Sequence, residues 1–347
     1  MGDSPALPRR VTSFDVAEAA GVSQSTVSRA LSGSPVITQE TRERIRAVAR
    51  EMGYQVDARA AGLRSGRTGV IAVIVVGRAG QAAMDANPFQ QSLLASVCAA
   101  ASQRGYRSLV AFEDGPEGLA LDHRASGTAD GIVCIGTTQN EAAWDHIRTQ
   151  LPRAAPVALW GTPFDDVPAL RSDNGAGGRQ AARALLDAGC ERPAFVGNTG
   201  SAQRQFSERE AGFRDALAQA GVGPSPGIVP AGSSRIGQGQ DAARQWLALT
   251  PGNRPDGLFF GCDAIALGTL PALAEAGVAV PGDVQAIGFD GVDAGQFTNP
   301  PLSSIRPDMA AAGTMLVEAA LGGPASARVP VEPVWRGSLK SSQGEKP

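Results

Sequence analysis

The chain has 347 residues, a formal net charge of −3, four cysteines and two histidines. Its length allows about two domains, and the scattered cysteines and histidines exclude a zinc site of ordinary spacing and a disulfide framework. The sequence lacks an export signal and an aliphatic run long enough to cross a bilayer, so we expect a cytoplasmic protein with reduced thiols, no metal and no cofactor.

Charge is distributed unevenly along the chain. Residues 1–67 contain ten Arg and seven Asp or Glu, a net charge of +3, whereas the remainder contains 21 basic and 27 acidic residues, a net charge of −6. A basic N-terminal part on an acidic body suits a protein whose N-terminal part alone meets phosphate groups.

The N-terminal part begins with residues 1–10, a predicted disordered arm, followed by a helix-turn-helix pattern over 11–31. Thr12 is predicted to cap the first helix, with Asp15 as its capping-box partner. Gly21 falls at the sharp turn, where a residue without a Cβ is favoured, and Ser23 is predicted to cap the second helix.

The second helix of this pattern has a polar outer face. Val27, Ala30 and Leu31 form its apolar stripe, so the hydrogen-bonding side chains point outward. An ordinary helical hairpin with a solvated face is the alternative, but such a face would carry Glu and Lys. We therefore interpret this helix as a reader of a DNA groove. The outward side chains are Gln24, Ser25, Thr26, Ser28 and Arg29.

A third helix from Thr38 to Met52, ended by Gly53, completes a predicted three-helix head over 11–55. Residues 56–67 then form a linker, in which Asp57 could cap a single helical turn that is too short to be stable alone. Leu63 is an exposed apolar residue among arginines in this segment.

From Thr68 the pattern changes to alternating strands and helices. Continuous aliphatic strands between helices indicate parallel sheets covered on both faces, and about ten strands favour two similar lobes. The tail at 341–347 is predicted to be disordered. Expected strands lie at 70–76, 107–112, 131–135, 156–160, 193–196, 227–229, 257–260 and 284–289.

The motifs of head, linker and body together resemble the lactose-repressor/galactose-repressor (LacI/GalR) family of bacterial transcription regulators over nearly the whole chain. The motifs are Val11–Leu31, Thr41-Arg42-Glu43-Arg44-Ile45, Met52-Gly53-Tyr54, Asn87-Pro88-Phe89, Ala129-Asp130-Gly131-Ile132, Ser172-Asp173-Asn174, Arg209-Glu210-Ala211-Gly212-Phe213, Val280-Pro281-Gly282-Asp283-Val284, Ile287-Gly288-Phe289-Asp290 and Pro300-Pro301-Leu302.

The resemblance implies a homodimer whose paired heads bind a pseudo-palindromic operator. It places Gln24, Ser25 and Arg29 at base-contacting positions in the major groove. It assigns phosphate contacts to Thr12, Ser13, Ser23, Thr26 and Ser28.

In the linker, the resemblance implies a hinge helix that binds DNA through Arg59 and inserts Leu63 into the minor groove. The alternative is that Leu63 packs on the body. The segment departs from the usual family pattern, which puts the operator affinity in question. The departures are Val56, Asp57, Ala61 and Gly62.

For residues 68–340 the resemblance implies an α/β, two-lobed, periplasmic-binding-protein-like (Rossmann-type) domain for effector binding and dimerisation. The expected first lobe spans about 68–171 and 303–328, and the second about 172–302 and 329–340. An effector would lie between the lobes, at the carboxyl ends of the strands. The expected effector residues are Phe89, Arg209, Ser234, Asp263 and Asp290.

Alternatives remain for these residues: Arg209 and Asp290 could form a surface ion pair, and Phe89 could pack in the core. Three positions also differ from sugar-responsive members of the family: Gly161 stands in place of Asp, Cys262 in place of Asn and Ser234 in place of an aromatic residue. They leave the chemistry of a sugar-like effector open.

An enzyme and a solute-binding protein are the other functional classes. Gly237-Gln238-Gly239 approximates a dinucleotide fingerprint but lacks the acidic residue at a fitting distance, and neither histidine suggests a catalytic triad. A two-lobed solute-binding protein would need an export signal and no DNA-binding head. We therefore expect a non-enzymatic, allosteric transcriptional repressor.

Overall fold

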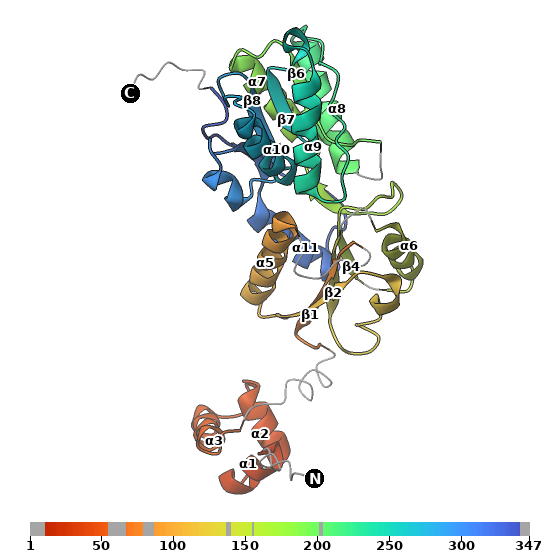
Figure 1. The fold of residues 1–347 in the computed structure, drawn as a ribbon. Coiled ribbons are helices and arrows are strands. Elements are labelled where there is room, and N and C mark those ends of the chain that lie inside the picture. Colours follow the sequence, from red (N-terminus) through yellow and green to blue (C-terminus); the bar gives the residue numbers. More distant parts are fainter. Residues whose placement is uncertain are drawn as a thin grey trace, which may run out of the picture. The chain divides into compact units, whose positions relative to one another are not determined.

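The computed structural model describes residues 11–54, 67–78, 87–136, 140–154, 156–200 and 204–340. The chain divides into two compact units, Met1–Thr68 and Gly69–Pro347 (Figure 1). The predicted arm at 1–10, most of the predicted hinge and the tail at 341–347 lie outside the described residues. The hinge positions concerned are Val56, Asp57, Arg59, Ala61, Gly62 and Leu63.

The first unit is a three-helix head, as the sequence predicts. Its helices are α1 (Ser13–Ala20), α2 (Gln24–Leu31) and α3 (Gln39–Glu51). Apolar side chains from all three helices form its small core, which holds Val16, Ala17, Ala20, Val27, Ala30, Ile45 and Ala49.

The predicted caps fix the geometry of the first two helices. The Thr12 amide donates to Asp15 Oδ2 at 2.7 Å and the Asp15 amide donates to Thr12 Oγ1 at 3.3 Å, which is the predicted capping box. Gly21 ends α1 with a φ of 64°, and the Ser23 hydroxyl accepts from the Thr26 amide. These local signals confirm the predicted turn.

The second unit contains two sheets, one in each lobe. The first lobe has a parallel sheet of order β10-β5-β4-β3-β1-β2. Its strands are β1 (Val70–Val76), β2 (Arg107–Glu113), β3 (Gly131–Gly136), β4 (Val157–Trp160), β5 (Leu170–Ser172) and β10 (Ala327–Val329). Its helices are α5 (Pro88–Gln103), η2 (Pro116–Gly118), α6 (Glu141–Gln150) and α11 (Met309–Ala320).

The helices cover both faces of this sheet. The side chains of α5 and α11 form one hydrophobic cluster with β1, β3 and β4, and the side chains of α6 form another with the opposite face. Figure 1 shows α5 and α11 side by side. This arrangement explains the continuous aliphatic strands in the sequence.

The second lobe has a sheet of order β11-β9-β8-β7-β6, in which β11 alone runs antiparallel to its neighbour. Its strands are β6 (Pro193–Val196), β7 (Gly257–Phe260), β8 (Gln285–Phe289), β9 (Ser303–Pro307) and β11 (Val331–Val334). Its helices are α7 (Asn174–Asp187), α8 (Arg204–Gln219), α9 (Arg235–Ala248), η3 (Pro251–Asn253), α10 (Asp263–Glu275) and η4 (Asp293–Phe297).

Three expectations about the lobes need correction. The first lobe does not resume at residue 303, because β9 pairs with β8; nor does the second lobe resume at 329, because β10 continues through Val329 beside β5. Residues 227–229 form an isolated bridge between Ile228 and Val196 instead of a strand. All three concern short segments, whose partners depend on tertiary contacts.

Helices α7 and α8 pack with their backbones in close approach. A Cβ at Gly178 would lie 2.1 Å from the Arg209 carbonyl oxygen, and a Cβ at Gly212 would lie 2.1 Å from the Gly175 carbonyl oxygen. Only glycine fits at either position without separating the helices. The same crossing fixes the start of α7 against the middle of α8.

We expect G212A to destabilise the second unit by roughly 1–3 kcal/mol, because the added methyl group overpacks this crossing. G223A is the matched control, since a Cβ at Gly223 meets no atom within 4 Å and its backbone requires no positive φ. Urea unfolding of both variants measures the difference. Equal stability of the two variants would contradict the proposed crossing.

Candidate functional site

The head presents the outer face of α2 together with the beginning of α1. The Gln24 side-chain amide donates to the Ser13 hydroxyl at 3.2 Å, so the two helix starts lie against each other. Ser25 and Arg29 are exposed on α2, whereas Gln24 is half-buried. The predicted base-contacting side chains therefore lie on one helix that is firmly positioned by its neighbour.

Two of the predicted phosphate-contacting residues also cap helices. Thr12 and Ser23 already use their hydroxyl groups to cap helices. Thr26 and Ser28 are half-buried along α2. Since the amide groups at a helix start attract anions, the two caps lie where a phosphate would be favoured.

Phe14 is a candidate that sequence reasoning missed. Its side chain is 71% exposed at the start of α1, next to Ser13, although a large aromatic side chain is normally buried. Apolar side chains in a DNA groove contact the thymine methyl group. The sequence does contain a signal for this exposure, because Phe14 lies outside the apolar stripe that Val16, Ala17 and Ala20 form on α1.

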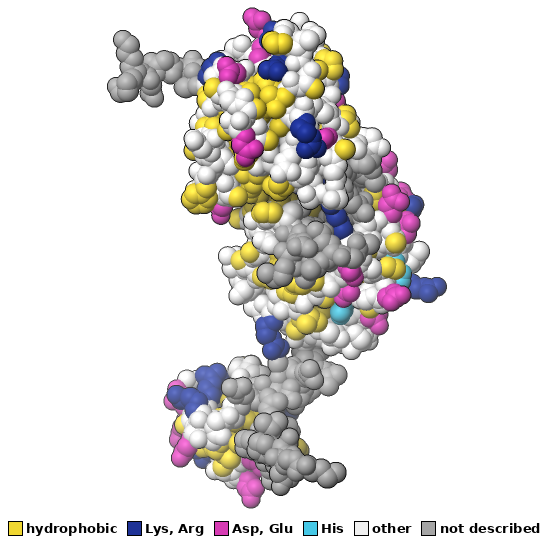
Figure 2. Space-filling model, in the orientation of Figure 1, with side chains coloured by type: hydrophobic (Ala, Val, Ile, Leu, Met, Phe, Trp, Pro, Cys, Tyr) yellow, Lys and Arg dark blue, Asp and Glu magenta, His cyan; other side chains and the backbone are white. Residues whose placement is uncertain are grey.

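Helix α3 lies at a different side of the head and carries mixed charge. Arginine and glutamate side chains alternate along its exposed surface (Figure 2). Arg42 is occupied within the head, because it donates to the carbonyl groups of Ser34 and Ile37. A surface of both signs is less suited to DNA than the outer face of α2.

The second unit contains a cavity of about 120 Å³ between its two lobes. Aromatic side chains and polar groups from both lobes form its wall, as is usual for small-molecule sites. The wall includes Asn87, Phe89, Gln90, Trp160, Gly161, Arg171, Ser172, Asn174, Gln205, Phe206, Arg209, Arg235, Cys262 and Asp290.

Arg209 on α8 is the central cation of this wall. Its Nε donates to Asn174 Oδ1 at 2.9 Å, and another guanidinium nitrogen donates to the Gly261 carbonyl. A third nitrogen lies 3.5 Å from Asp290 Oδ1. The guanidinium carbon also lies 3.5 Å from the centre of the Phe289 ring. These contacts hold the charge in one orientation.

Asp290 follows β8 and has an unusual backbone, with a φ of 118°. Burial raises the pKa of its carboxyl to about 6, while Arg209 acts in the opposite direction. Non-glycine residues with such a φ are strained and cluster at functional sites. The strand end thus presents an acceptor beside Arg209, facing the cavity.

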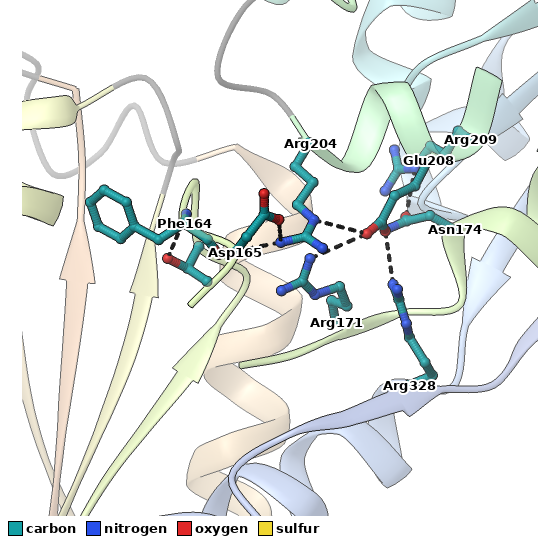
Figure 3. A network of polar contacts seen from close by, with 9 residues as sticks. Phe164, Asp165, Arg171, Asn174, Arg204, Glu208, Arg209 and Arg328 are labelled. Carbon is teal, nitrogen blue, oxygen red and sulfur yellow. Dashed lines mark hydrogen bonds and ion pairs between the residues drawn. The ribbon is translucent and has the colours of Figure 1, made fainter. Parts of the chain in front are cut away.

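Glu208, adjacent to Arg209, joins the two lobes (Figure 3). It accepts from Arg171 of β5 at 3.2 Å and from Arg328 of β10 at 2.8 Å. Arg204 and Asn174 donate to the same carboxylate from the second lobe. Burial alone would raise the pKa of Glu208, but the hydrogen bonds from Arg328 and Asn174 outweigh it, and the pKa lies below its usual range.

The structure brings together three of the five predicted effector residues. Phe89, Arg209 and Asp290 line the cavity, and Phe89 also packs against Trp160 with ring centres 5.9 Å apart. Arg209 and Asp290 do pair, but inside the cavity wall and not on an exposed surface. Arg171 and Arg235 are wall residues that sequence reasoning missed.

The other two predicted effector residues lie elsewhere. The Ser234 hydroxyl caps α9 by accepting from the Gly237 amide at 3.0 Å. Asp263 is fully buried behind the wall, where its side-chain oxygens accept from the Ser304 hydroxyl at 2.6 Å and the Val292 amide at 2.8 Å. Both side chains therefore support the site from outside the cavity.

Gly239, one of the two glycines that approximate a dinucleotide fingerprint, has a packing role. A Cβ at Gly239 would lie 2.1 Å from the Ile265 carbonyl oxygen, where α9 crosses α10. Within the described ranges, no group of His, Cys, Asp or Glu side chains could hold a metal ion. No helix in this part of the chain is long and apolar enough to cross a membrane.

Comparison with known families gives matches in both units. A family model described as bacterial regulatory proteins, lacI family, matches residues 14–57. A model described as a periplasmic binding protein-like domain matches residues 182–339. The first covers the helix-turn-helix of the head, and the second covers most of the lobe that contains Arg209 and Asp290.

Relatives extend over most of the chain. The ribose operon repressor of Escherichia coli K12 is 30% identical over 300 residues, covering 85% of this chain and 87% of that protein. The transcriptional regulator CelR of Thermobifida fusca is 29% identical over 305 residues, covering 86% of this chain and 87% of that protein. Catabolite control protein A of Priestia megaterium is 26% identical over 300 residues, with coverages of 85% and 87%.

Solved structures share the fold. A lac repressor dimer bound to operator and the anti-inducer ONPF has a TM-score of 0.76 at 23% identity, covering 95% of this chain and 99% of that one. A CelR–cellobiose complex has a TM-score of 0.64 at 26% identity, covering 95% of this chain and 100% of that one.

The buried carboxyl group of Asp263, behind the cavity, predicts a pH-dependent stability. Burial raises the pKa of Asp263 to about 8 from an ordinary 3.8, so the folded protein binds more protons than the unfolded chain between these values. The free energy of unfolding should therefore fall as the pH rises from about 5 to 8.

The matched variant is D263N, whose amide can donate to Ser304 and accept from Val292 without titrating. Urea unfolding across this pH range should show a smaller decrease for D263N than for the unchanged protein. Parallel pH profiles of the two proteins would contradict the raised pKa.

Proposed function

The chain belongs to the LacI family of bacterial transcriptional regulators, and we propose that it represses transcription by binding a palindromic operator as a homodimer under the control of a sugar-like effector. The observation that carries this proposal is the pairing of two features in one chain. A capped helix-turn-helix presents a polar face, and a separate two-lobed unit encloses an aromatic and charged cavity.

In this proposal α2 enters the major groove of the operator. Arg29 is suited to guanine and Gln24 to adenine, because their side chains can each form two hydrogen bonds to those base edges. Ser25 completes the base-contacting set, and Phe14 adds an apolar contact. Phosphate contacts that position the helix come from Thr12, Ser13, Ser23, Thr26 and Ser28.

The proposed hinge acts next to the head. Arg59 contacts DNA, and Leu63 inserts into the minor groove at the centre of the operator, where the cost of unstacking is offset by contacts in the bent DNA. The unusual residues Val56, Asp57, Ala61 and Gly62 supply little additional phosphate contact, which predicts a modest contribution of this segment to affinity.

Dimerisation is supported by the outer strand of the first lobe. Strand β2 lies at the edge of its sheet, and Leu109, Val110 and Phe112 on it are exposed. An apolar edge strand invites pairing and is normally covered. In the second lobe, Figure 2 shows hydrophobic side chains gathered on the face that carries α10. We propose a dimer and not a tetramer.

Control by the effector follows from the two-lobed cavity. A ligand that binds one arrangement of the lobes more tightly shifts the population toward it, and residues 55–66 connect this unit to the head in sequence. The names of several relatives refer to sugars, namely ribose and cellobiose, which supports a sugar-like ligand. We place this regulator in the cytoplasm, and at the nucleoid when it binds operator.

A two-lobed solute-binding protein is the alternative function. The match of residues 14–57 to a DNA-binding regulator family and the relatives that extend over 85% of the chain do not favour it. A solute-binding function does not require a capped helix α2 with an exposed polar face.

The proposal predicts that R29A weakens binding to the operator, obtained by selection from random DNA, by roughly tenfold to a hundredfold and relaxes sequence preference at one symmetric pair of positions. R44A is the control, because it removes an exposed charge from α3. R44A should leave the sequence preference unchanged, as measured by electrophoretic mobility at fixed salt. Unchanged preference in R29A would contradict base reading by α2.

The hinge is tested separately by L63A. Loss of the inserted side chain should reduce both the operator affinity and the DNA bend, because less surface is buried in the minor groove. Circular permutation of the operator fragment measures the bend. If bend and affinity match those of the unchanged protein, Leu63 does not insert.

A further inference from the structure

Helix α8 reaches the first lobe through two charged side chains next to the cavity. Arg204 and Glu208 lie one turn apart on this helix, with Arg204 Nε 3.2 Å from Glu208 Oε1. Each of them also pairs with residues of the first lobe (Figure 3). The second lobe therefore presents a neighbouring cation and anion to the first lobe, and both charges meet an opposite charge there.

The cation contacts the loop between β4 and β5 of the first lobe. Arg204 donates to the Phe164 carbonyl oxygen at 3.2 Å and pairs with the Asp165 carboxylate. The loop is held on its own lobe by Arg148 of α6, whose guanidinium carbon lies 4.6 Å from the centre of the Phe164 ring and which pairs with Asp166. The two neighbouring carboxylates therefore make different contacts, Asp166 within the first lobe and Asp165 between the lobes.

The anion makes the more buried contact. Arg171 of β5 lies 3.2 Å from the Glu208 carboxylate, and Arg328 of β10 lies 2.8 Å from it. The side chains of Arg171 and Glu208 are 14% and 18% exposed, so solvent screens this pair little and the loss of one partner is costly. The Asp165 side chain is 89% exposed, and an exposed pair contributes little by itself. Glu208 therefore supplies most of the attraction between the lobes at this place.

Three guanidinium groups converge on the Glu208 carboxylate, two from the first lobe and one from the second. Burial lowers the pKa of Arg171 and Glu208 raises it, while repulsion from Arg204 and Arg328 lowers it further. Without the carboxylate, Arg204 of the second lobe would face the two arginines of the first lobe with like charge. Glu208 therefore decides whether this contact between the lobes attracts or repels.

The same contacts extend into the cavity wall. Arg171 and Asn174 both line the cavity and both donate to Glu208, Asn174 at 2.7 Å. Asn174 in turn accepts from Arg209 at 2.9 Å. A ligand in the cavity would therefore lie next to the groups that join the lobes.

We propose that Asp165, Arg204 and Glu208 form an ion-pair latch, which favours the present arrangement of the lobes without a ligand and sets the balance that a ligand must shift. All contacts of the latch are between protein groups, so it requires no ligand to form. This inference rests on the proposed control by lobe arrangement. Because a ligand shifts an equilibrium only by its differential affinity, the strength of the latch determines how large that difference must be.

Double electron–electron resonance on the full chain measures the separation of the lobes without any ligand. Spin labels are attached to T149C on α6 and A218C on α8, two exposed positions in different lobes. The background is C98S, because Cys98 is partly exposed whereas the other cysteines are buried. Labelled protein is diluted with unlabelled protein, so that the distances within one chain are measured. A weakened latch should move part of the population to longer distances.

The buried contact is tested with E208Q. This variant should change the ratio of the two populations by about tenfold or more, because it removes a shared carboxylate of low exposure from among three cations. E210Q is the matched control, since Glu210 lies on the same helix and pairs with Arg214 within it. The distances in E210Q should equal those of the unchanged protein.

The exposed contact is tested with D165N, which leaves the buried carboxylate in place and is informative even if E208Q does not fold. A shift of roughly twofold to fivefold is expected, since exposed ion pairs are weak. D166N is the matched control, because Asp166 pairs with Arg148 of the same lobe and the contact of Arg148 with Phe164 remains. D166N should leave the distances unchanged.

The double variant E208Q/R204Q separates a latch from a general loss of stability. In E208Q, Arg204 faces Arg171 and Arg328 across the boundary between the lobes. Removing its charge in this background relieves repulsion, so part of the population should return to the shorter distance. Residues with a purely structural role would make the double variant at least as separated as E208Q.

Two results would overturn the latch. One is that E208Q and D165N give the same distances as E210Q and D166N, and the other is that E208Q/R204Q is at least as separated as E208Q. Operator affinity is measured on the same variants, with the operator obtained by selection. If lobe separation changes while operator affinity does not, the latch stands and the proposed control by lobe arrangement is wrong.

Discussion

The ion pairs of the Glu208 carboxylate hold the two lobes of the second unit together. Glu208 lies on α8 of the second lobe and forms ion pairs with Arg171 of β5 and Arg328 of β10 in the first lobe. Both strands end next to points where the chain passes between the lobes. Asn174 donates to this carboxylate and accepts from Arg209, which reaches Asp290. A continuous polar chain thus runs from the lobe junction into the cavity.

Backbone packing keeps this polar chain in place. Asn174 begins α7 and Arg209 belongs to α8, and these helices are held together by glycines that admit the neighbouring carbonyl groups. Because the contact is backbone to backbone, small rearrangements of side chains cannot move one helix relative to the other. The crossing therefore keeps Asn174 and Arg209 in a fixed position relative to each other.

The sequence predicted the local features well and the distant ones less well. Thr12, Gly21 and Ser23 act through their own backbone neighbours, so their capping and turn roles follow from spacing alone. Arg209 and Asp290 could be placed through the family resemblance. Ser234 and Asp263 could not, because hydrogen bonds to Gly237, Val292 and Ser304 decide whether each side chain faces the cavity. Arg171 and Arg235 escaped notice because they reach the cavity wall only through the tertiary fold.

The separation between the core of the head and its exposed face has an evolutionary consequence. Val27 and Ala30 hold α2 in the head, whereas Ser25 and Arg29 point away from that core. Exchanges at the exposed positions are nearly neutral for stability, because surface substitutions seldom change it by more than about 0.5 kcal/mol. Under the proposed base reading by α2, copies of such a head can diverge in operator preference after gene duplication while each intermediate sequence still folds. New regulatory circuits are then accessible by single substitutions.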